Sequence, residues 1–356
     1  MSRVSPRIVA AFALLLVALS PFSSLSAQGK KDEGTTSFVV IGDFGSALQN
    51  MKSKAAEKAV AEMVRKWDPD FIITLGDNNY KEGEASTITG NVGKYYCDYI
   101  YNDGAPNHQR CDGWATKHKT NLFFPSLGNH DWEQPNAQPY IDYFSQLPGE
   151  KRYYDFEQGP VHFFVIDSQS PGACDCKDPK YYEPDGTDPE SPQGQWLKKK
   201  LKESQTPWKL VYFHHAPYTC KAASKWMRWP FEDWGASAVL AGHKHLYERI
   251  TRSDNPDFPY FVNGVGGTKL TECSAKNAEA NLPASDFDHI TISGYHGAMW
   301  AAATADQLTF KFYVVDGEVK KDECVLTKTK DGQKLKCTGA SEQKPISDDE
   351  VQGEEP

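Results

Sequence analysis

The stretch FIITLGDNNY, Phe71–Tyr80, decides the fold of this chain of 356 residues. Its apolar first half, Phe71–Leu75, is typical of a buried β-strand. Gly76 then permits a sharp turn, and Asp77 and Tyr80 follow just beyond the strand, where open α/β sheets place their ligands. A carboxylate and a phenol are both oxygen donors, so they suit a hard, highly charged metal ion. A single strand ending in Gly-Asp is weak evidence, because Gly-Asp is also a common turn.

Four other apolar runs end in the same kind of residue. The runs are Phe38–Ile41, Leu122–Leu127, Leu210–Phe213 and Ala238–Ala241. In the same order, they are followed by GDFG, GNHD, HHAPY and GHKH. The polar residues that follow them are Asp43, Asn129, His130, Asp131, His214, His215, His243 and His245. Because such strand ends converge at the carboxyl edge of a sheet, we expect one site. Its donors lack Cys, which favours a pair of iron, zinc or manganese ions over a thiolate zinc site or a calcium loop.

The rest of the pattern predicts an α/β protein. Residues 50–66 carry apolar side chains at helical spacing between two strands, which implies a right-handed parallel crossover. The second half of the chain is richer in strands than a doubly wound sheet would be. We therefore expect a four-layer α-β-β-α sandwich of two mixed sheets flanked by helices. Further strands and one further helix are predicted at Val161–Ile166, Tyr260–Val265, Leu308–Val315 and Gln195–Leu201.

The motifs resemble, in order, the five motifs of the calcineurin-like metallophosphoesterases. They are Asp43-Phe44-Gly45, Gly76-Asp77-Asn78-Asn79-Tyr80, Gly128-Asn129-His130-Asp131, His215-Ala216-Pro217 and Gly242-His243-Lys244-His245. The Tyr80 variant of the second motif is similar to purple acid phosphatases, especially the small tartrate-resistant type. Residues 193–201, QGQWLKKKL, also resemble a helix of that type. The resemblance covers residues 38 to 267 and implies a phosphate ester hydrolase.

The resemblance also implies a division of the metal ligands. It assigns Asp43, Tyr80 and His245 to one ion, and it assigns Asn129, His215 and His243 to the other. Asp77 can bridge the two ions because a carboxylate has two oxygens. A Tyr80 phenolate implies Fe(III) at the first position, with Fe(II), Zn or Mn at the second. The implied nucleophile is a metal-bound hydroxide, and a trivalent ion predicts an acid pH optimum.

Three further side chains are candidates for catalytic roles. His130 is expected to contact the phosphate or to protonate the leaving oxygen, and Asp131 is expected to hold its ring. Two adjacent His residues stand in the fourth motif, and its His-x-Pro frame selects His215 as the ligand. His214 is then a candidate for substrate contact, although adjacent residues of a strand point to opposite faces. The alternative is electrostatic binding of the phosphate by Lys221, Lys225 and Arg228.

The ends of the chain differ from its middle. Arg3 and Arg7 precede an apolar run, Ile8–Leu19, and small residues follow as far as Ala27; this pattern is typical of a secretory signal. The run is too short to span a bilayer, and the alternative is a buried or membrane-surface helix. We expect residues 1–27 to be a signal peptide, residues 28–340 a metallophosphoesterase domain, and residues 341–356 an acidic disordered tail. The protein is expected outside the cytoplasm, either extracellular or periplasmic, with no membrane attachment once the signal is removed.

Net charge indicates which partners are expected, and cysteine content indicates the redox compartment. The formal net charge of −9 does not favour a nucleic acid, whereas a small phosphate ester stays compatible because metal ions supply local positive charge. Eight Cys in an exported chain suggest disulfides. Loop and hairpin signals favour Cys97–Cys111 and Cys324–Cys337. The connectivity of the other four stays open; they are Cys174, Cys176, Cys220 and Cys273.

The leading interpretation is a secreted acid phosphatase that acts on phosphate monoesters. One alternative is a phosphodiesterase or nucleotidase on the same scaffold, because fold and metals do not fix the ester. Another is a secreted binding protein with a vestigial metal site. All seven ligand positions carry competent residue types, which argues against the vestigial site.

Overall fold

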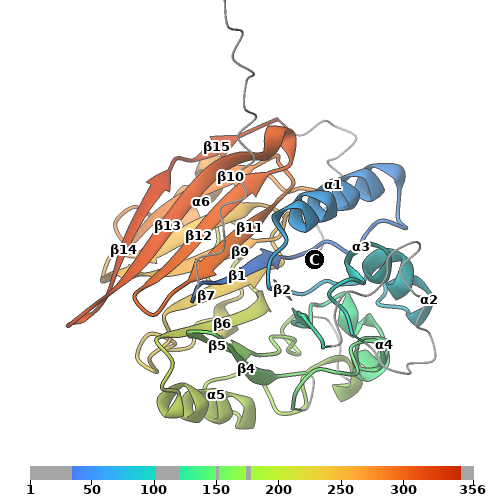
Figure 1. The fold of residues 1–356 in the computed structure, drawn as a ribbon, viewed down its shortest axis with the longest axis horizontal. Coiled ribbons are helices and arrows are strands. Elements are labelled where there is room, and N and C mark those ends of the chain that lie inside the picture. The colour runs from blue at the N-terminus through green and yellow to red at the C-terminus, as the bar shows by residue number, and fades with distance from the viewer. Residues whose placement is uncertain (1–33, 102–119, 150–151, 174–177, 346–356) are drawn as a thin grey trace, which may run out of the picture. The chain divides into compact units, whose positions relative to one another are not determined.

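The computed structural model describes residues 34–101, 120–149, 152–173 and 178–345. Two mixed β-sheets account for most of the secondary structure in these residues (Figure 1). The expected class, a sandwich of two mixed sheets flanked by helices, is therefore confirmed. The helices that flank the sheets are few.

The first sheet has seven strands in the order β14-β13-β12-β11-β1-β2-β3. Its three strands β1, β2 and β3 are parallel, and the others pair antiparallel. Helix α1 connects β1 to β2, as the apolar periodicity predicts. The strands are β1 (Thr36–Ile41), β2 (Phe71–Thr74), β3 (Phe123–Pro125), β11 (Gly297–Ala303), β12 (Gln307–Val314), β13 (Val319–Thr329) and β14 (Gly332–Gly339).

The second sheet has eight strands in the order β15-β10-β8-β9-β7-β6-β5-β4. Its central strands β5, β6, β7 and β9 are parallel. Helix α5 lies in the connection from β5 to β6. The strands are β4 (Tyr154–Gln158), β5 (Val161–Val165), β6 (Trp208–His215), β7 (Ala238–Gly242), β8 (Tyr247–Arg252), β9 (Asn255–Asn263), β10 (Phe287–Ser293) and β15 (Glu342–Gln343).

The two longest helices begin at side-chain caps. The Asn50 side chain accepts a hydrogen bond from the backbone N–H of Ser53, and the Ser191 side chain accepts one from Gly194. The α-helices are α1 (Met51–Trp67), α2 (Ala85–Ile88), α3 (Lys94–Tyr96), α4 (Gln138–Tyr143), α5 (Pro192–Glu203) and α6 (Ala275–Asn281). Short 3-10 or π turns occupy Thr89–Gly93, Asp131–Glu133, Pro135–Ala137, Pro179–Tyr181, Lys225–Met227 and Asp316–Glu318.

An apolar core joins the inner faces of the two sheets. Phe38 of β1 packs edge-on against Phe163 of β5, with ring centroids 5.1 Å apart, and Phe71 of β2 contacts the same ring. Aromatic pairs of this geometry contribute about 0.5–1.5 kcal/mol each beyond their buried area. A second cluster covers the outer face of the eight-stranded sheet, where Leu197 and Leu201 of α5 are fully buried. The strand ends that carry the polar motifs are thus held by packing on both sides.

Several predicted boundaries shift in the structure. The predicted strand Leu210–Phe213 is longer, since β6 continues through His214 and His215. At the other end of the chain, Glu342 and Gln343 pair with β10, while residues 346–356 of the expected tail lie outside the described residues. The expected signal segment, residues 1–27, also lies outside them. Among the described residues no helix has the length and apolar character needed to cross a bilayer.

Two disulfides join described cysteines. Cys324 and Cys337 stand directly opposite each other on β13 and β14 and are bonded, which confirms that prediction. Cys220 is bonded to Cys273, a pairing that the sequence left open. Cys97 is also disulfide-bonded, and its predicted partner lies outside the described residues together with two other cysteines; these three are Cys111, Cys174 and Cys176.

Candidate metal centre

Five strand ends bring the predicted ligands together. Strands β1, β2 and β3 of one sheet and β6 and β7 of the other end at the same place, so that two sheets contribute to one site. The side chains that meet there are Asp43, Asp77, Tyr80, Asn129, His214, His215, His243 and His245. All the expected strand ends therefore converge, as the motif pattern predicts.

One group of three donors lies on the side of β1. The Asp43 Oδ1 atom is 3.4 Å from the Tyr80 hydroxyl and 3.2 Å from His245 Nε2. The Tyr80 hydroxyl is in turn 3.3 Å from His245 Nε2. The three donor atoms therefore form a triangle with nearly equal edges.

A second triangle lies on the side of β6 and β7. The Asn129 Oδ1 atom is 3.0 Å from His214 Nε2 and 3.1 Å from His243 Nδ1. The two imidazole nitrogens of His214 and His243 are 3.2 Å apart. The His214 Nδ1 atom donates to the Leu75 carbonyl at 2.8 Å, which leaves Nε2 as the ring nitrogen that faces the triangle.

The Asp77 Oδ2 atom connects the two triangles. It lies 2.9 Å from the Tyr80 hydroxyl of the first triangle and 3.3 Å from His214 Nε2 of the second. Ligands on one metal ion with bonds of 2.0–2.2 Å are about 2.8–3.6 Å apart at octahedral or tetrahedral angles. The edges of both triangles fall in that range, so the residues fit two ions that share one carboxylate.

The loops that carry the ligands have unusual backbone conformations. Asp43, Asp77 and His243 have φ values of 54°, 51° and 68°, in the left-handed region that non-glycine residues rarely occupy. Neighbouring glycines allow the close packing that this requires. A Cβ on Gly242 would lie 2.6 Å from Asp43 Oδ2, and one on Gly76 would lie 2.6 Å from His214 Nδ1. The Gly-Asp and Gly-His pairs of the motifs thus have a steric cause.

Burial and mutual charge set the protonation of these ligands. Burial alone would raise the pKa of Asp77, but the charges of His214 and His130, together with hydrogen bonds from both residues, outweigh it and hold the pKa well below its usual value. Against the effect of burial, Asp77 and Asp43 raise the pKa of His214 to about 9. Burial lowers the pKa of His215 and of His243, which keeps both rings neutral. A metal ion at His214 must therefore displace a proton.

Comparison with known proteins identifies the fold that carries this donor set. The family profile for calcineurin-like phosphoesterases matches residues 36–247.

The chain belongs to the calcineurin-like phosphoesterase family.

Members of this family hydrolyse phosphoric esters, and the family implies a binuclear metal centre. Purple acid phosphatase 17 of Arabidopsis thaliana is 24% identical over 311 residues, which cover 81% of this chain and 84% of that protein. A purple acid phosphatase of Glycine max is 25% identical over 236 residues, covering 58% of this chain and 46% of the relative. The chain thus spans about half the length of some curated relatives.

A solved structure has the same fold. It is a purple acid phosphatase from seeds of yellow lupin, Lupinus luteus, with a TM-score of 0.61 at 14% sequence identity. The superposition covers 84% of this chain and 55% of the lupin chain.

The two adjacent His residues of this phosphoesterase both lie at the centre, and together with His243 they could hold a metal ion. His214 enters the second donor triangle, whereas the His215 Nδ1 atom is 2.8 Å from Ser168 Oγ. The His215 Nε2 atom is buried and has no hydrogen-bond partner. The pairing of β6 with β7 shifts its register between Tyr212 and His215, so the simple alternation of faces fails there. Strand alternation, which argued against a role for His214 at the site, therefore does not apply at this strand end.

His130 and Asp131 are also close to the centre but do not form the expected pair. The His130 ring lies over the Tyr80 ring with centroids 4.3 Å apart, and its Nδ1 atom is 2.7 Å from the Lys81 carbonyl. The buried Asp131 carboxylate instead accepts hydrogen bonds from the backbone N–H of Gly128 and from the backbone and side chain of Asn78. Asp131 therefore ties two ligand loops together, and the prediction that it holds the His130 ring is corrected.

Sequence reasoning missed two polar residues that support the ligands. Asn78 donates to Asp131 and to the Ser126 carbonyl, and so joins the loops after β2 and β3. Ser168, just after β5, contacts both the backbone N–H and the ring of His215. Asn78 stands inside GDNNY and could have been singled out by its place beside Asp77. Ser168 has no motif that marks it.

Proposed function

We propose that this protein is a secreted acid phosphatase that hydrolyses phosphate monoesters at a binuclear metal centre. The observation that carries the proposal is the pair of donor triangles that share the Asp77 Oδ2 atom. The curated relatives are named purple acid phosphatases, which supports this choice of reaction. The disulfides are consistent with export to an oxidising compartment.

The donor chemistry suggests which ion each triangle would hold. Asp43, Tyr80 and His245 combine a carboxylate, a phenol and an imidazole, and a phenolate favours Fe(III). Asn129, His214 and His243 combine an amide oxygen with two imidazoles, which suits Fe(II), Zn or Mn once His214 has lost its proton. We thus place His214, rather than the His215 that the His-x-Pro frame selects, among the ligands.

Such a pair of ions lowers the pKa of water and stabilises charge on a phosphoryl group. His130 would act on the substrate side. Its Nδ1 atom faces the Lys81 carbonyl, an acceptor, so Nδ1 carries a proton, and its Nε2 atom lies 4.0 Å from Asp77 Oδ2. In the imidazolium form that acid conditions favour, the Nε2–H group can donate to a phosphate oxygen or to the leaving oxygen. An acid pH optimum follows from this proton and from a trivalent ion.

The test is metal analysis of the purified protein together with its visible spectrum and its activity on a matched monoester and diester. We expect two ions per chain, one of them iron, and faster hydrolysis of the monoester. Faster hydrolysis of the diester would indicate that the protein is a phosphodiesterase and not a phosphatase. A protein that binds no metal and hydrolyses neither ester would refute the proposal and indicate a binding protein. Secretion is checked separately, since a cleaved signal predicts a mature N-terminus near Gln28.

A further inference from the structure

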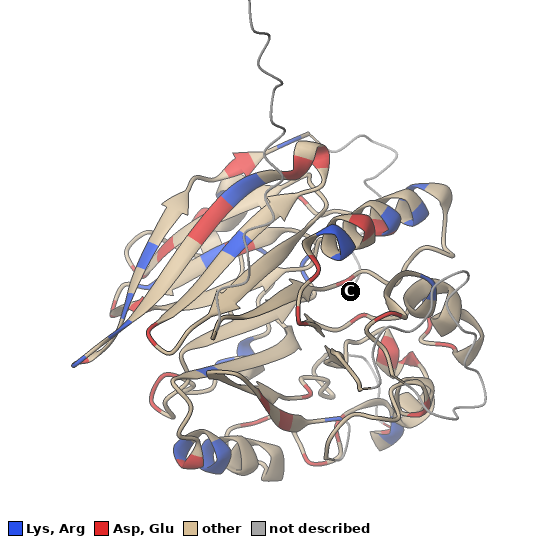
Figure 2. Ribbon diagram, in the orientation of Figure 1, with Lys and Arg blue, Asp and Glu red and all other residues tan. Residues whose placement is uncertain are grey.

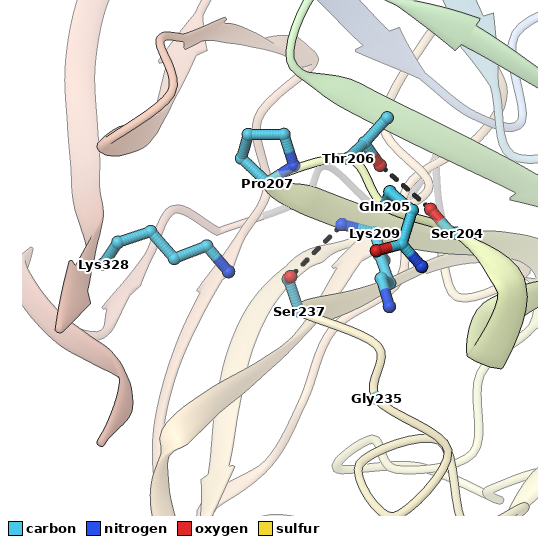
Figure 3. Close-up of a pocket in the computed structure, with 8 residues that line it drawn as sticks. All are labelled: Ser204, Gln205, Thr206, Pro207, Lys209, Gly235, Ser237 and Lys328. Carbon is cyan, nitrogen blue, oxygen red and sulfur yellow. Dashed lines mark hydrogen bonds between the residues drawn. The ribbon is translucent and has the colours of Figure 1, made fainter. Parts of the chain in front are cut away.

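A polar cavity lies far from the metal centre. It has a volume of about 370 Å³ and opens at the start of β6 (Figure 3). Lys209 is the second residue of β6, whereas His214 and His215 are its last two. At about 3.3 Å per residue, the cavity and the centre are on the order of 20 Å apart along this strand. Ligands of the metal centre therefore do not extend into it.

The walls of this cavity come from both sheets. Lys209 and Ser237 belong to the side of the eight-stranded sheet, and Lys328 belongs to β13 of the other sheet. In Figure 3 the Lys328 side chain reaches from its own wall toward Lys209 and Ser237. The Gln333 side chain of β14 donates to the Ser237 carbonyl, and the Trp208 indole donates to the Thr304 carbonyl. These contacts between sheets fix the spacing of the two walls.

The two lysines of the cavity lack acidic partners. Lys209 Nζ donates one hydrogen bond to the Leu201 carbonyl, at 2.8 Å, and Lys328 Nζ lies 4.3 Å from the centroid of the Trp208 ring. In the part of the chain that the structure describes, neither ammonium forms an ion pair with a carboxylate. Burial lowers the pKa of Lys209, and burial together with the charge of Lys209 lowers the pKa of Lys328. Because each ammonium has a single contact of this kind, it keeps N–H groups that can be donated to a ligand.

Several lysines near this cavity are paired with acidic residues, unlike Lys209 and Lys328. Acidic and basic residues are intermingled over α1, α5 and β13 (Figure 2). Most lysines on the neighbouring strands have acidic partners: Lys311 with Glu323, Lys321 with Glu342 and Lys334 with Asp257. The chain as a whole carries a formal net charge of −9, so acidic residues are not scarce. The absence of a carboxylate between Lys209 and Lys328 is therefore a local feature of this cavity.

The structural roles of the two lysines do not use their full donor capacity. Lys209 caps a carbonyl in the last turn of α5, where a cation is favourable. Lys328 makes a cation–π contact with Trp208. Ser237 accepts a hydrogen bond from the backbone N–H of Lys209 through its Oγ atom, and its own hydroxyl proton remains available. Two ammonium groups and one hydroxyl are a donor set suited to an oxyanion.

We propose that this cavity binds the phosphate group of a small ligand, at a site separate from the metal centre. Lys209 and Lys328 would neutralise two negative charges from opposite walls, and Ser237 would donate to a third oxygen. The volume also accommodates an organic group attached to the phosphate. Inorganic phosphate and a phosphate-bearing metabolite share this chemistry.

The first test uses the unaltered holoprotein and measures acetylation of its lysines by peptide mapping. Inorganic phosphate, at ten times its dissociation constant, should slow the labelling of Lys328 on the order of tenfold. The labelling of Lys334, which already has Asp257 as a partner, should stay unchanged. Phosphate at the metal centre cannot shield Lys328 over this distance. Equal labelling of Lys328 with and without phosphate would overturn the proposal.

The second test counts binding sites by calorimetry on the holoprotein. Wild type should bind two phosphates per chain, and the double variant Lys209→Gln/Lys328→Gln should bind one while phosphatase activity is retained. Lys334→Gln is the matched control and should still bind two. Phenylphosphonate in place of inorganic phosphate distinguishes the two sources of ligand, since preferential binding of phenylphosphonate at the second site indicates an organic phosphate. Two sites in the double variant would contradict the proposal even if the enzyme were active.

Discussion

The His214 Nε2 atom lies 3.3 Å from Asp77 Oδ2. His214 and His215 are adjacent residues at the end of β6, yet their ring nitrogens have different partners. His215 directs its Nδ1 atom toward Ser168 Oγ instead, and its ring centroid is still within 4.7 Å of that of His243. The irregular pairing at the end of β6 brings both rings to the same edge of the sheet. The two residues therefore make different contributions, and mutation can separate them.

Replacement of His214 should remove one metal ion. We expect His214→Ala to fall from about two ions per chain to about one, because the second triangle loses one of its three donors. His215→Ala should keep both ions, since its ring contacts Ser168 rather than Asn129 or Asp77. Elemental analysis of the two purified variants checks this. The opposite result, with metal lost only from His215→Ala, would restore the ligand that the His-x-Pro frame selects.

Tyr80 should determine the colour of the protein. Its hydroxyl is within 3.4 Å of Asp43, Asp77 and His245 donor atoms, so a phenolate there can transfer charge to Fe(III) and absorb visible light. Tyr80→Phe should lose the visible band and retain most of its iron. The spectrum and iron content of the oxidised proteins are measured side by side. A colourless wild type without iron would make Tyr80 a packing residue and place a divalent pair in the centre.

Replacement of His130 should affect turnover and not metal content. Its ring is tilted by 45° against that of Tyr80 and its Nδ1 atom is fixed by the Lys81 carbonyl, so it is placed as a proton donor rather than as a ligand. His130→Ala should lower kcat roughly 10²–10⁴-fold. The half-buried His289 of β10 offers a control, and His289→Ala should leave kcat unchanged. Loss of an ion from His130→Ala would instead identify His130 as a ligand.

Much of this site could be predicted because its sequence signals are local. A short apolar run that ends in Gly-Asp, Gly-Asn or Gly-His specifies a strand and the ligand after it, whatever the rest of the chain does. Asp43, Asp77 and Tyr80 are thus found at the positions where the motifs place them. Two mixed sheets followed from the same reasoning, since the second half of the chain has too many strands for one parallel sheet.

Features that depend on contacts between distant segments could not be predicted. The choice between His214 and His215 depends on a register shift between β6 and β7, which no local pattern specifies. Asp131 follows His130 directly, yet its partners are Gly128 and Asn78, because the loops after β2 and β3 pack together. The cavity between Lys209 and Lys328 likewise needs two strands from different sheets to meet.

The Cys324–Cys337 bond should stabilise the C-terminal hairpin and leave the metal centre intact. It closes a loop with a sequence separation of 13 and joins the opposed strands β13 and β14. The double variant Cys324→Ser/Cys337→Ser should lose about 2–4 kcal/mol in free energy of unfolding. Denaturant unfolding measures the loss, and metal analysis serves as the control. A variant that unfolds like wild type would mean that strand pairing alone holds the hairpin.

Glu248 should make the stability of the protein fall as pH rises toward neutral. Its side chain is fully buried in β8 and accepts hydrogen bonds from the backbone N–H of Cys220 and from the Thr291 hydroxyl, both at 3.0 Å. Burial raises the pKa of its carboxyl from 4.5 to about 7, although these hydrogen bonds lower it. The folded protein thus holds this proton more tightly than the unfolded chain. The resulting stabilisation is complete below pH 4.5 and is lost as pH rises to about 7.

Glu248→Gln tests whether stability falls as pH rises because of Glu248, since glutamine does not ionise. Relative to wild type, the variant should gain about 3 kcal/mol between pH 4 and pH 8, since each pKa unit corresponds to about 1.4 kcal/mol. Urea unfolding at several pH values measures the difference, and Glu279→Gln on the exposed face of α6 is the control that should show no such trend. If the difference between Glu248→Gln and wild type does not vary with pH, Glu248 is ionised in the fold, and the hydrogen bonds from Cys220 and Thr291 offset the cost of its burial.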